Sequence, residues 1–387
     1  MPIKSRLAAK AGDGSKVGKL LEVVKLFKNS VLHPIDGSAK KYPKVIQLPI
    51  TYRCNSKCVM CNIWQMDTSN EANIEEFTAF MKDDIFKEVE AVGINGGEPS
   101  LIVNLPDFAE QILKLPKIKS LNIISHGFST KLILKAVEKI YSLCKEANVT
   151  FHISISLDGY KDIHDEVRGR PKTFEKTMAT IDEIHQNKHK YCDSIDLGCT
   201  VVSQNIDHLI ELDQFTINKN YDIKFRLGIE NKRIESDKLT DQFSVLYSDY
   251  RQSAKEFFHY KFISSNKLND KFKYFAIYYW LRSAKTKRLL GCMWKEEGVT
   301  LDSRGELYYC AVASESLGTL REEKGEAVFF SDKNINYRKE LITNSCDGCI
   351  HDYSGTPEIP SLLIFFREFL FEKLSMKIYK LKLKIMR

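Results

Sequence analysis

The stretch YRCNSKCVMCNIW, residues 52–64, decides the fold of this 387-residue chain. Its cysteines, Cys54, Cys58 and Cys61, are spaced C-x3-C-x2-C and follow an apolar run at 45–50 that predicts a β-strand. A structural zinc ion takes four protein ligands, commonly from paired C-x2-C motifs, whereas an iron–sulfur cluster takes one cysteine at each iron. Three close cysteines therefore indicate a cluster with one iron left open for a further ligand. A zinc-bound loop and three buried thiols are the structural alternatives.

A second motif, NGGEP at residues 95–99, follows another apolar run at 89–94. The two motifs in this order resemble the radical S-adenosylmethionine (SAM) superfamily, in which C-x3-C-x2-C precedes a GGE-type motif. Met60 departs from that family, which usually has an aromatic residue before the third cysteine. The resemblance implies a [4Fe–4S] cluster on the three cysteines, with SAM bound at the open iron. It also implies an enzyme that cleaves SAM reductively to a 5′-deoxyadenosyl radical, which abstracts hydrogen from a substrate.

Strand-like and helix-like segments alternate from residue 45 onward. The predicted strands are 45–50, 89–95, 119–125, 149–157, 194–202 and 222–229. The predicted helices between them are 73–83, 104–115, 129–146, 172–188 and 205–216. Such βα units predict an α/β fold with a parallel sheet and helices outside it. The resemblance implies, more specifically, a partial (β/α)6 TIM-like barrel.

Candidate functional residues follow the first four predicted strands, at the end where barrel enzymes keep their chemistry. The family's GGE segment binds the amino group of SAM, and it corresponds here to Gly96, Gly97 and Glu98. Glycine lets a backbone approach a ligand closely, and a carboxylate accepts a hydrogen bond from an ammonium group. The resemblance therefore implies SAM contacts at these three residues.

Further SAM contacts are implied by two other segments. The segment SLDGYKDIHDEVRG, residues 156–169, resembles the family's S-x-D-G…H-D-x-x-R-G segment, so that Ser154 or Ser156 contacts SAM and Arg168 suits its carboxylate. Ser125, after the third predicted strand, is a further candidate. The alternatives are a turn-forming role for Ser125 and a surface ion pair for Arg168.

A second set of cysteines lies near the C-terminal end of the sequence. Cys292 and Cys310 precede and close the stretch VTLDSRGELYYC, which predicts a β-hairpin, and Cys346 and Cys349 follow as C-x2-C. Four cysteines alone suit structural zinc. Behind a radical SAM barrel, however, this set resembles the twitch domain, the short relative of the seven-cysteine SPASM domain. The resemblance implies a second, fully protein-bound [4Fe–4S] cluster that accepts an electron from the oxidised substrate.

The sequence divides into five predicted segments. These are a basic helical extension at 1–41, the barrel at 42–235, a helical bridge at 236–290, the auxiliary cluster domain at 291–355 and a basic amphipathic helix at 356–387. The last segment has an apolar stripe with lysines beside it. Its members include Leu363, Phe366, Leu370 and Leu374. This stripe either packs on the barrel or lies on an anionic membrane surface.

Composition excludes several other classes. Ten cysteines without a secretory segment indicate metal or redox use in a reducing compartment, and no apolar run approaches the roughly 20 residues of a membrane span. We therefore expect a cytoplasmic protein. Residues 1–41 carry nine Lys and Arg against three Asp and Glu, and residues 361–387 carry seven against two. The net charge of +7 thus comes from the two ends, which argues against nucleic-acid binding and leaves peripheral membrane contact through both ends as a hypothesis.

The substrate is the least determined property. We expect an oxidoreductase that oxidises or rearranges a small polar molecule, such as a sugar or aminocyclitol, with flavodoxin or ferredoxin as electron donor. This follows from the four-cysteine set and from the short segment of about forty residues before the first strand, which lacks a leader-peptide-binding pattern. A peptide-modifying SPASM maturase is the second hypothesis. A non-catalytic iron–sulfur or zinc scaffold is the third, and the sequence assigns no catalytic acid or base.

Overall fold

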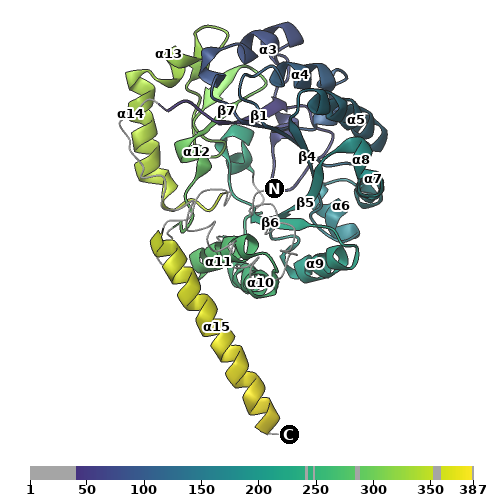
Figure 1. The fold of residues 1–387 in the computed structure, drawn as a ribbon, viewed down its shortest axis with the longest axis vertical. Helices are drawn as coiled ribbons and strands as arrows, with labels where there is room; N and C mark the ends of the chain where they lie inside the picture. Colours follow the sequence, from purple (N-terminus) through teal and green to yellow (C-terminus); the bar gives the residue numbers. More distant parts are fainter. Residues whose placement is uncertain (1–40, 240–242, 247–248, 284–287, 352–358, 386–387) are drawn as a thin grey trace, which may run out of the picture. The chain divides into compact units, whose positions relative to one another are not determined.

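The computed structural model describes residues 41–239, 243–246, 249–283, 288–351 and 359–385 (Figure 1). The predicted N-terminal helix therefore lies outside the described residues. The chain forms two compact units, of which the larger comprises Lys40–Ala254 and Trp294–Asp347. The smaller comprises Met1–Ala39, Lys255–Met293 and Gly348–Arg387. The five predicted segments do not coincide with these units, and their boundaries stay predictions.

The larger unit is organised around one sheet with the strand order β6-β5-β4-β3-β2-β1-β7-β8-β9. The first six strands are β1 (Val45–Thr51), β2 (Ala91–Gly96), β3 (Ser120–Ser125), β4 (Thr150–Ser156), β5 (Ser194–Val201) and β6 (Ile223–Leu227). Each pairs in parallel with its neighbour in sequence. Every strand predicted for the barrel is present, and the predicted partial (β/α)6 fold is confirmed.

Helices connect these strands and cover the outside of the sheet (Figure 1). They are α3 (Ile74–Met81), α4 (Leu105–Ile112), α5 (Thr130–Glu146), α6 (Asp162–Arg168), α7 (Thr173–Gln186), α8 (Lys188–Tyr191) and α9 (Leu209–Asn218). Helix α4 shows why they pack there, because Leu105, Phe108, Ala109 and Ile112 are buried and recur on one helical face. Short 3-10 turns complete the connections. Among them are η1 (Ile63–Gln65), η2 (Asp84–Phe86), η3 (Pro99–Leu101), η4 (Ile206–His208), η5 (Lys232–Ile234) and η6 (Ser236–Lys238).

The hairpin predicted between Cys292 and Cys310 is present, and it extends the barrel sheet. Strand β7 (Gly298–Leu301) runs parallel to β1, with Val45 opposite Gly298, and β8 (Glu306–Tyr308) and β9 (Gly318–Thr319) follow as antiparallel strands. The remaining elements here are α12 (Met293–Glu296), α13 (Gly325–Phe329), α14 (Asp332–Leu341) and the π-helical turn η7 (Ile342–Cys346). The auxiliary hairpin is thus attached directly to the strand that leads into the first three cysteines.

The smaller unit is helical in its described part. It contains α11 (Leu268–Arg282), α15 (Ile359–Ile385) and residues 255 onward of α10 (Arg251–Ser264). Phe365 of α15 is fully buried, and its ring lies 5.0 Å from that of Phe272 and 5.4 Å from that of Phe275. No helix in the described part of the chain is both long and apolar enough to cross a membrane.

Candidate functional site

The loop with the first three cysteines leaves the C-terminal end of β1 and is fixed on one side by the GGE segment after β2. The backbone N–H of Gly97 donates to the carbonyl of Thr51 at 2.7 Å, and that of Glu98 donates to the carbonyl of Arg53 at 2.8 Å. A Cβ atom at Gly97 would lie 2.0 Å from the Arg53 oxygen, and one at Gly96 would lie 2.4 Å from the Thr51 oxygen. Gly97 is therefore required by contact with the cysteine loop and Gly96 by contact with the end of β1, a reason that the sequence prediction did not contain.

The other side of the cysteine loop is fixed by the end of α6. The N–H of Lys57 and the hydroxyl of Ser56 both donate to the carbonyl of Arg168, at 3.1 and 2.9 Å. Gly169 ends the helix with φ at +61°, and a Cβ atom there would lie 2.2 Å from the Lys57 oxygen. The RG pair of the predicted segment thus shapes the loop through its backbone.

The three thiols lie in surroundings that suit iron ligands. Cys54, Cys58 and Cys61 are all partly buried, and burial raises the pKa of Cys54 and Cys61 to about 12. Such thiols ionise when a metal binds them, because a coordinating thiol is deprotonated outright. Ser56 Oγ lies 3.2 Å from Cys58 Sγ, and Arg168 Nη1 donates to the same sulfur at 3.5 Å. The Arg168 guanidinium is thus the donor beside the Cys58 sulfur, since the Ser56 hydroxyl hydrogen goes to the Arg168 carbonyl.

Among the residues that the structure describes, no three His, Cys, Asp or Glu side chains surround a point where one metal ion would bind. A cubic cluster places each thiolate on a different iron, so its ligands do not meet at one ion. The donor set and the flanking hydrogen-bond donors therefore fit an iron–sulfur cluster on Cys54, Cys58 and Cys61.

Glu98 is buried and held by three donors. Its Oε1 accepts from Ser125 Oγ at 2.7 Å and from the N–H of Ser100 at 3.1 Å, and its Oε2 accepts from the N–H of His126 at 2.9 Å. A carboxylate has about four acceptor positions. The second position on Oε2 is approached by His126 Nε2 at 3.3 Å, and that nitrogen also lies 2.8 Å from Asn55 Oδ1. Ser125 positions Glu98, and because its oxygen also accepts from Gly127, it shapes the turn as well.

Arg168 forms a buried ion pair, and not the surface pair that was the alternative to SAM binding. Its Nη2 contacts Asp158, whose Oδ1 accepts from the N–H of Thr200 at 2.7 Å. Its Nε is buried without a hydrogen-bond partner among the described residues. A buried donor without an acceptor is unfavourable, so this atom is available to a ligand.

The two candidate serines of β4 occupy different environments. Ser154 is buried inside the strand, and Ser156 is half-buried as its last residue, two positions before Asp158. His164 accepts from the N–H of Asp158 at 3.1 Å, and burial lowers its pKa to about 3. His164 therefore serves as a neutral acceptor that shapes this loop.

Three residues near the cysteine loop were missed by sequence reasoning. Asn55 lies 2.8 Å from His126 Nε2 through its side chain, and its carbonyl accepts from Arg170 at 2.7 Å. Arg233, on η5 after β6, has Nε and Nη1 buried without hydrogen-bond partners in the described part of the chain. Arg170 follows the RG pair directly, but no motif marks Asn55 or Arg233.

The second cysteine set is divided between the two compact units. Cys310 and Cys346 belong to the larger unit, and Cys292 and Cys349 to the smaller. All four are partly exposed thiols. Within the larger unit, Arg338 lies over the ring of Tyr309 at 4.9 Å, next to Cys310 in sequence. A shared site of the four cysteines stays a prediction.

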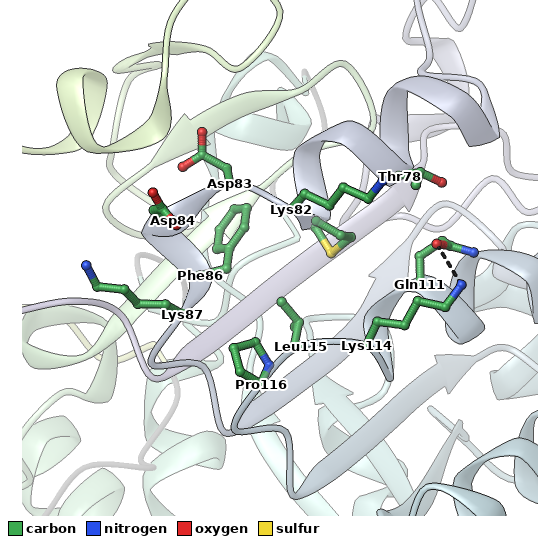
Figure 2. A pocket seen from close by; sticks show the side chains of 11 residues that line it. Thr78, Lys82, Asp83, Asp84, Phe86, Lys87, Gln111, Lys114, Leu115 and Pro116 are labelled. Atoms are coloured by element: carbon green, nitrogen blue, oxygen red, sulfur yellow. Dashed lines mark hydrogen bonds between the residues drawn. The ribbon is translucent and has the colours of Figure 1, made fainter.

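A cavity of about 190 Å³ lies elsewhere in the larger unit (Figure 2). Its lining comes from the end of α3, from η2 and from the end of α4, which are the segments that precede β2 and β3. Lys82, Lys87 and Lys114 are among the lining side chains, together with Phe86 (Figure 2). The cavity therefore lies at the N-terminal end of the barrel strands, where residues contribute to stability in barrel enzymes. None of the candidate site residues lines it.

Comparison with known sequences agrees with the two motifs. Residues 48–213 match the radical SAM superfamily model. Molybdenum cofactor biosynthesis protein 1 of Drosophila melanogaster is 23% identical over 236 residues, which cover 60% of this chain and 39% of that protein. The sporulation killing factor maturation protein SkfB of Bacillus subtilis is 24% identical over 223 residues, covering 57% of this chain and 50% of SkfB. The chain thus spans half or less of these relatives.

Comparison with solved structures extends the likeness beyond the barrel. The structure of anSMEcpe with bound AdoMet and Cp18Cys peptide has a TM-score of 0.57 at 17% identity and covers 87% of this chain and 99% of that chain. Streptococcus suis SuiB bound to S-adenosylmethionine has a TM-score of 0.54 at 16% identity, and the match covers 83% of this chain and 72% of the SuiB chain. At these identities the likeness establishes the fold. The family match covers the cysteine loop and strands β2 to β5, so residues 48–213 belong to the radical SAM superfamily.

Proposed function

We propose that this radical SAM enzyme oxidises or rearranges a small polar substrate at the C-terminal mouth of its barrel. The observation that carries the proposal is the fixation of the cysteine loop, which is hydrogen-bonded to the GGE segment on one side and to the end of α6 on the other. Cys54, Cys58 and Cys61 would hold a [4Fe–4S] cluster. When bound, such a cluster supplies the low-potential electron that cleaves SAM.

The residues of the chain bind and orient SAM in this proposal. The Glu98 carboxylate suits the SAM ammonium group, which would replace the 3.3 Å contact of His126 Nε2 with Oε2, and Arg168 Nε suits the SAM carboxylate. Ser154 or Ser156 completes the contacts from β4. Because Ser125, Ser100 and His126 already hold the Glu98 carboxylate, the amino group would meet a fixed acceptor, which limits the entropy lost on binding.

Arg233 supports a substrate with an anionic or strongly polar group. Its Nε and Nη1 are buried without partners among the described residues, and its charge acts on Cys61. A guanidinium group in this state gains most from a carboxylate or phosphate ligand. Substitution Arg233→Gln should then raise the KM for the substrate by a larger factor than it slows uncoupled SAM cleavage, because Arg233 would bind the substrate directly and acts on Cys61 only through its charge.

Peptide modification is the second candidate. It is favoured by the solved structures of similar fold, which include anSMEcpe with a bound Kp18Cys peptide and SuiB bound to its precursor peptide SuiA. Under either proposal, Cys292, Cys310, Cys346 and Cys349 hold a second [4Fe–4S] cluster that accepts the substrate electron. Flavodoxin or ferredoxin supplies the first electron, and the enzyme acts as an oxidoreductase.

The decisive experiment is anaerobic reconstitution with iron and sulfide, followed by measurement of 5′-deoxyadenosine under dithionite. Release of 5′-deoxyadenosine is expected from the wild type, and a Cys54→Ala/Cys58→Ala/Cys61→Ala variant should release none. Intact SAM in the wild-type reaction would support the non-catalytic scaffold instead. Addition of sugars or aminocyclitols, and separately of peptides encoded beside the gene, then discriminates the substrates by faster 5′-deoxyadenosine release and by a new product, which is two hydrogens lighter after oxidation and an isomer of the substrate after rearrangement.

A further inference from the structure

Helix α15 packs with a face other than the apolar stripe that its sequence displays. Leu362 and Phe365 are fully buried, and Phe369 packs against Phe262 with ring centroids 6.2 Å apart. Leu363, Leu370 and Leu374 of the stripe are exposed. Leu363 is 61% exposed and Leu370 is 65% exposed.

The exposed apolar side chains lie on one side of α15, together with the exposed Arg367. Leu363, Leu370, Phe371 and Leu374 are spaced by seven, one and three residues, which places them on a single side of an α-helix. Phe371 is 66% exposed and Leu374 is 57% exposed. We name these four residues the outer face of α15. Large apolar side chains that gather in this way mark an interaction surface, whereas scattered ones do not.

The acidic residues of α15, Glu368 and Glu372, contact the helices on which it packs. Glu368 pairs with Arg282 at 3.2 Å, and Glu372 contacts His259 at 3.1 Å. The remaining charged residues of the helix are all Lys or Arg, and four lysines lie between positions 376 and 385. Both acidic side chains are thus taken up by contacts with the neighbouring helices, and residues 361–387, with seven Lys and Arg against two Asp and Glu, are cationic.

We propose that the outer face of α15 binds the surface of an anionic lipid bilayer, with the helix lying in the plane of that surface. An exposed row of leucine and phenylalanine inserts among the acyl chains, while lysines on the same helix attract the phosphate headgroups. The helix is not apolar enough to span a bilayer, which agrees with a position in its plane. The inference goes beyond the proposed function and does not depend on SAM cleavage.

The positive charge of α15 favours an anionic bilayer over a second copy of the chain as the partner of its outer face. Two copies that met through their outer faces would bring two lysine-rich helices together, and like charges repel. An anionic bilayer instead supplies both an apolar interior and the opposite charge. The apolar face and the lysines then act together, which is the pair of signals that stable membrane attachment needs.

The test is flotation of the reconstituted full-length protein with vesicles of phosphatidylglycerol and phosphatidylcholine, compared with phosphatidylcholine alone. The variant Leu370→Gln/Phe371→Gln/Leu374→Gln removes most of the outer face. The control variant Leu132→Gln/Ile210→Gln/Ile217→Gln removes exposed apolar side chains from α5 and α9, where they are 52%, 47% and 62% exposed. Circular dichroism and 5′-deoxyadenosine release should be unchanged in both, because all six residues are exposed and lie outside the site.

Wild type and control variant should float with the anionic vesicles alone, and added salt should weaken the binding. The α15 variant should bind at least about tenfold more weakly. Equal flotation of the α15 variant, or no flotation of the wild type, would overturn the proposal. A wild-type dimer in solution that the α15 variant converts to a monomer would also overturn it, in favour of a second copy of the chain.

Discussion

At the scale of single residues, Gly97 shows that the GGE motif has a structural role, because it packs against the backbone of the cysteine loop. The nearest atom to a Cβ at this position is a backbone oxygen, which cannot move away as a flexible side chain could. Gly93, in the same strand that leads to the motif, offers a matched control, because a Cβ there would meet only the Ile46 oxygen at 3.9 Å. The two substitutions to alanine therefore differ in one respect, the contact with the cysteine loop.

We expect Gly97→Ala to displace the cysteine loop and to destabilise the fold by about 1–3 kcal/mol, as overpacking does. Iron bound after reconstitution should fall by about half, since only the first cluster is affected, and 5′-deoxyadenosine release should disappear. Gly93→Ala should retain both. Iron analysis and product measurement on the two variants check this, and a Gly97→Ala protein with full iron content would show that the loop tolerates the movement.

Arg168 has a second role that its predicted contact with SAM does not include. It donates to Cys58 Sγ, and hydrogen bonds to cluster sulfurs raise reduction potentials. Substitution Arg168→Met removes that bond and a positive charge, so the first cluster should become harder to reduce, with a more negative midpoint potential. It also leaves Asp158 buried without its partner, which costs about 3–5 kcal/mol of stability.

The measurements for Arg168→Met are a potentiometric titration followed by EPR and urea unfolding of the same sample. Arg168→Met/Asp158→Asn is the companion variant, since it removes the unpaired buried charge and should recover part of the stability. The potential should stay lowered in the companion, because the bond to Cys58 is still missing. A potential equal to that of the wild type in both variants would contradict the role assigned to the bond.

His126 predicts a pH dependence of stability. Burial lowers its pKa from the ordinary 6.5 to about 4, with Glu98 acting in the opposite direction. Between these values the unfolded chain binds a proton and the folded chain does not, so the folded state loses stability as pH falls from 6.5 towards 4. At pH 5 this loss amounts to about 2 kcal/mol.

Substitution His126→Asn should therefore reduce the difference in unfolding free energy between pH 7.5 and pH 5 by about 2 kcal/mol. Urea unfolding of wild type and variant at both pH values measures it. His164, whose pKa burial lowers to about 3, stays in both proteins and contributes equally. An unchanged pH difference would mean that His126 is protonated in the folded protein, through its contact with Glu98.

At the scale of elements, the local sequence was enough to predict the barrel because each strand and helix carries its own pattern. The alternation in β3, where Leu121, Ile123 and Ser125 are buried in turn, is visible without tertiary information. The parallel pairing of β7 with β1 joins distant parts of the chain, and no local pattern encodes it. The packed face of α15 was also beyond the sequence, because both of its sides carry large apolar residues and only the partner helices select one.

Some residues of the candidate site could likewise be predicted from the sequence, and others depend on the fold. Motif spacing predicted Cys54, Cys58, Cys61 and the GGE segment as site residues, and in the structure the GGE segment is hydrogen-bonded to the cysteine loop. The hydrogen bonds that hold the cysteine loop against the end of α6 were not predicted, since the contact of Lys57 with Arg168 depends on how α6 ends. Arg233 was missed for a similar reason, as only the fold brings η5 near Cys61.

The turn between β7 and β8 gives a prediction at this scale. Asp302 is buried and accepts from Tyr52 Oη at 2.8 Å and from the N–H groups of Arg304 and Glu306, both at 2.9 Å. It therefore connects the auxiliary hairpin with the residue that begins the cysteine loop. Asp302→Ala leaves these buried donors without an acceptor and should lower the free energy of unfolding by about 3 kcal/mol.

Tyr52→Phe is the matched variant for Asp302→Ala, because it removes one of the same hydrogen bonds and leaves the turn intact. It should cost about 1 kcal/mol. Urea unfolding of both variants compares them. A loss as large in Tyr52→Phe as in Asp302→Ala would show that the link to the cysteine loop, and not the turn, carries the stability.

At the scale of the whole molecule, the two cysteine sets predict how much iron the chain binds. Two [4Fe–4S] clusters require about eight iron and eight sulfide ions per chain. The alternative of one cluster and structural zinc requires about four iron ions and one zinc ion. Metal analysis of the anaerobically reconstituted full-length protein separates the two, and the first result is expected.

Variants of each cysteine set then assign the iron to its site. Cys54→Ala/Cys58→Ala/Cys61→Ala and Cys292→Ala/Cys310→Ala should each retain about four iron ions, because each removes the ligands of one cluster. Cys192→Ala is the control, since its thiol is buried outside both sets and its loss should leave all the iron bound. If Cys292→Ala/Cys310→Ala kept about eight iron ions, the second set would not hold a cluster, and the electron acceptor in the proposed reaction would have to be a separate protein.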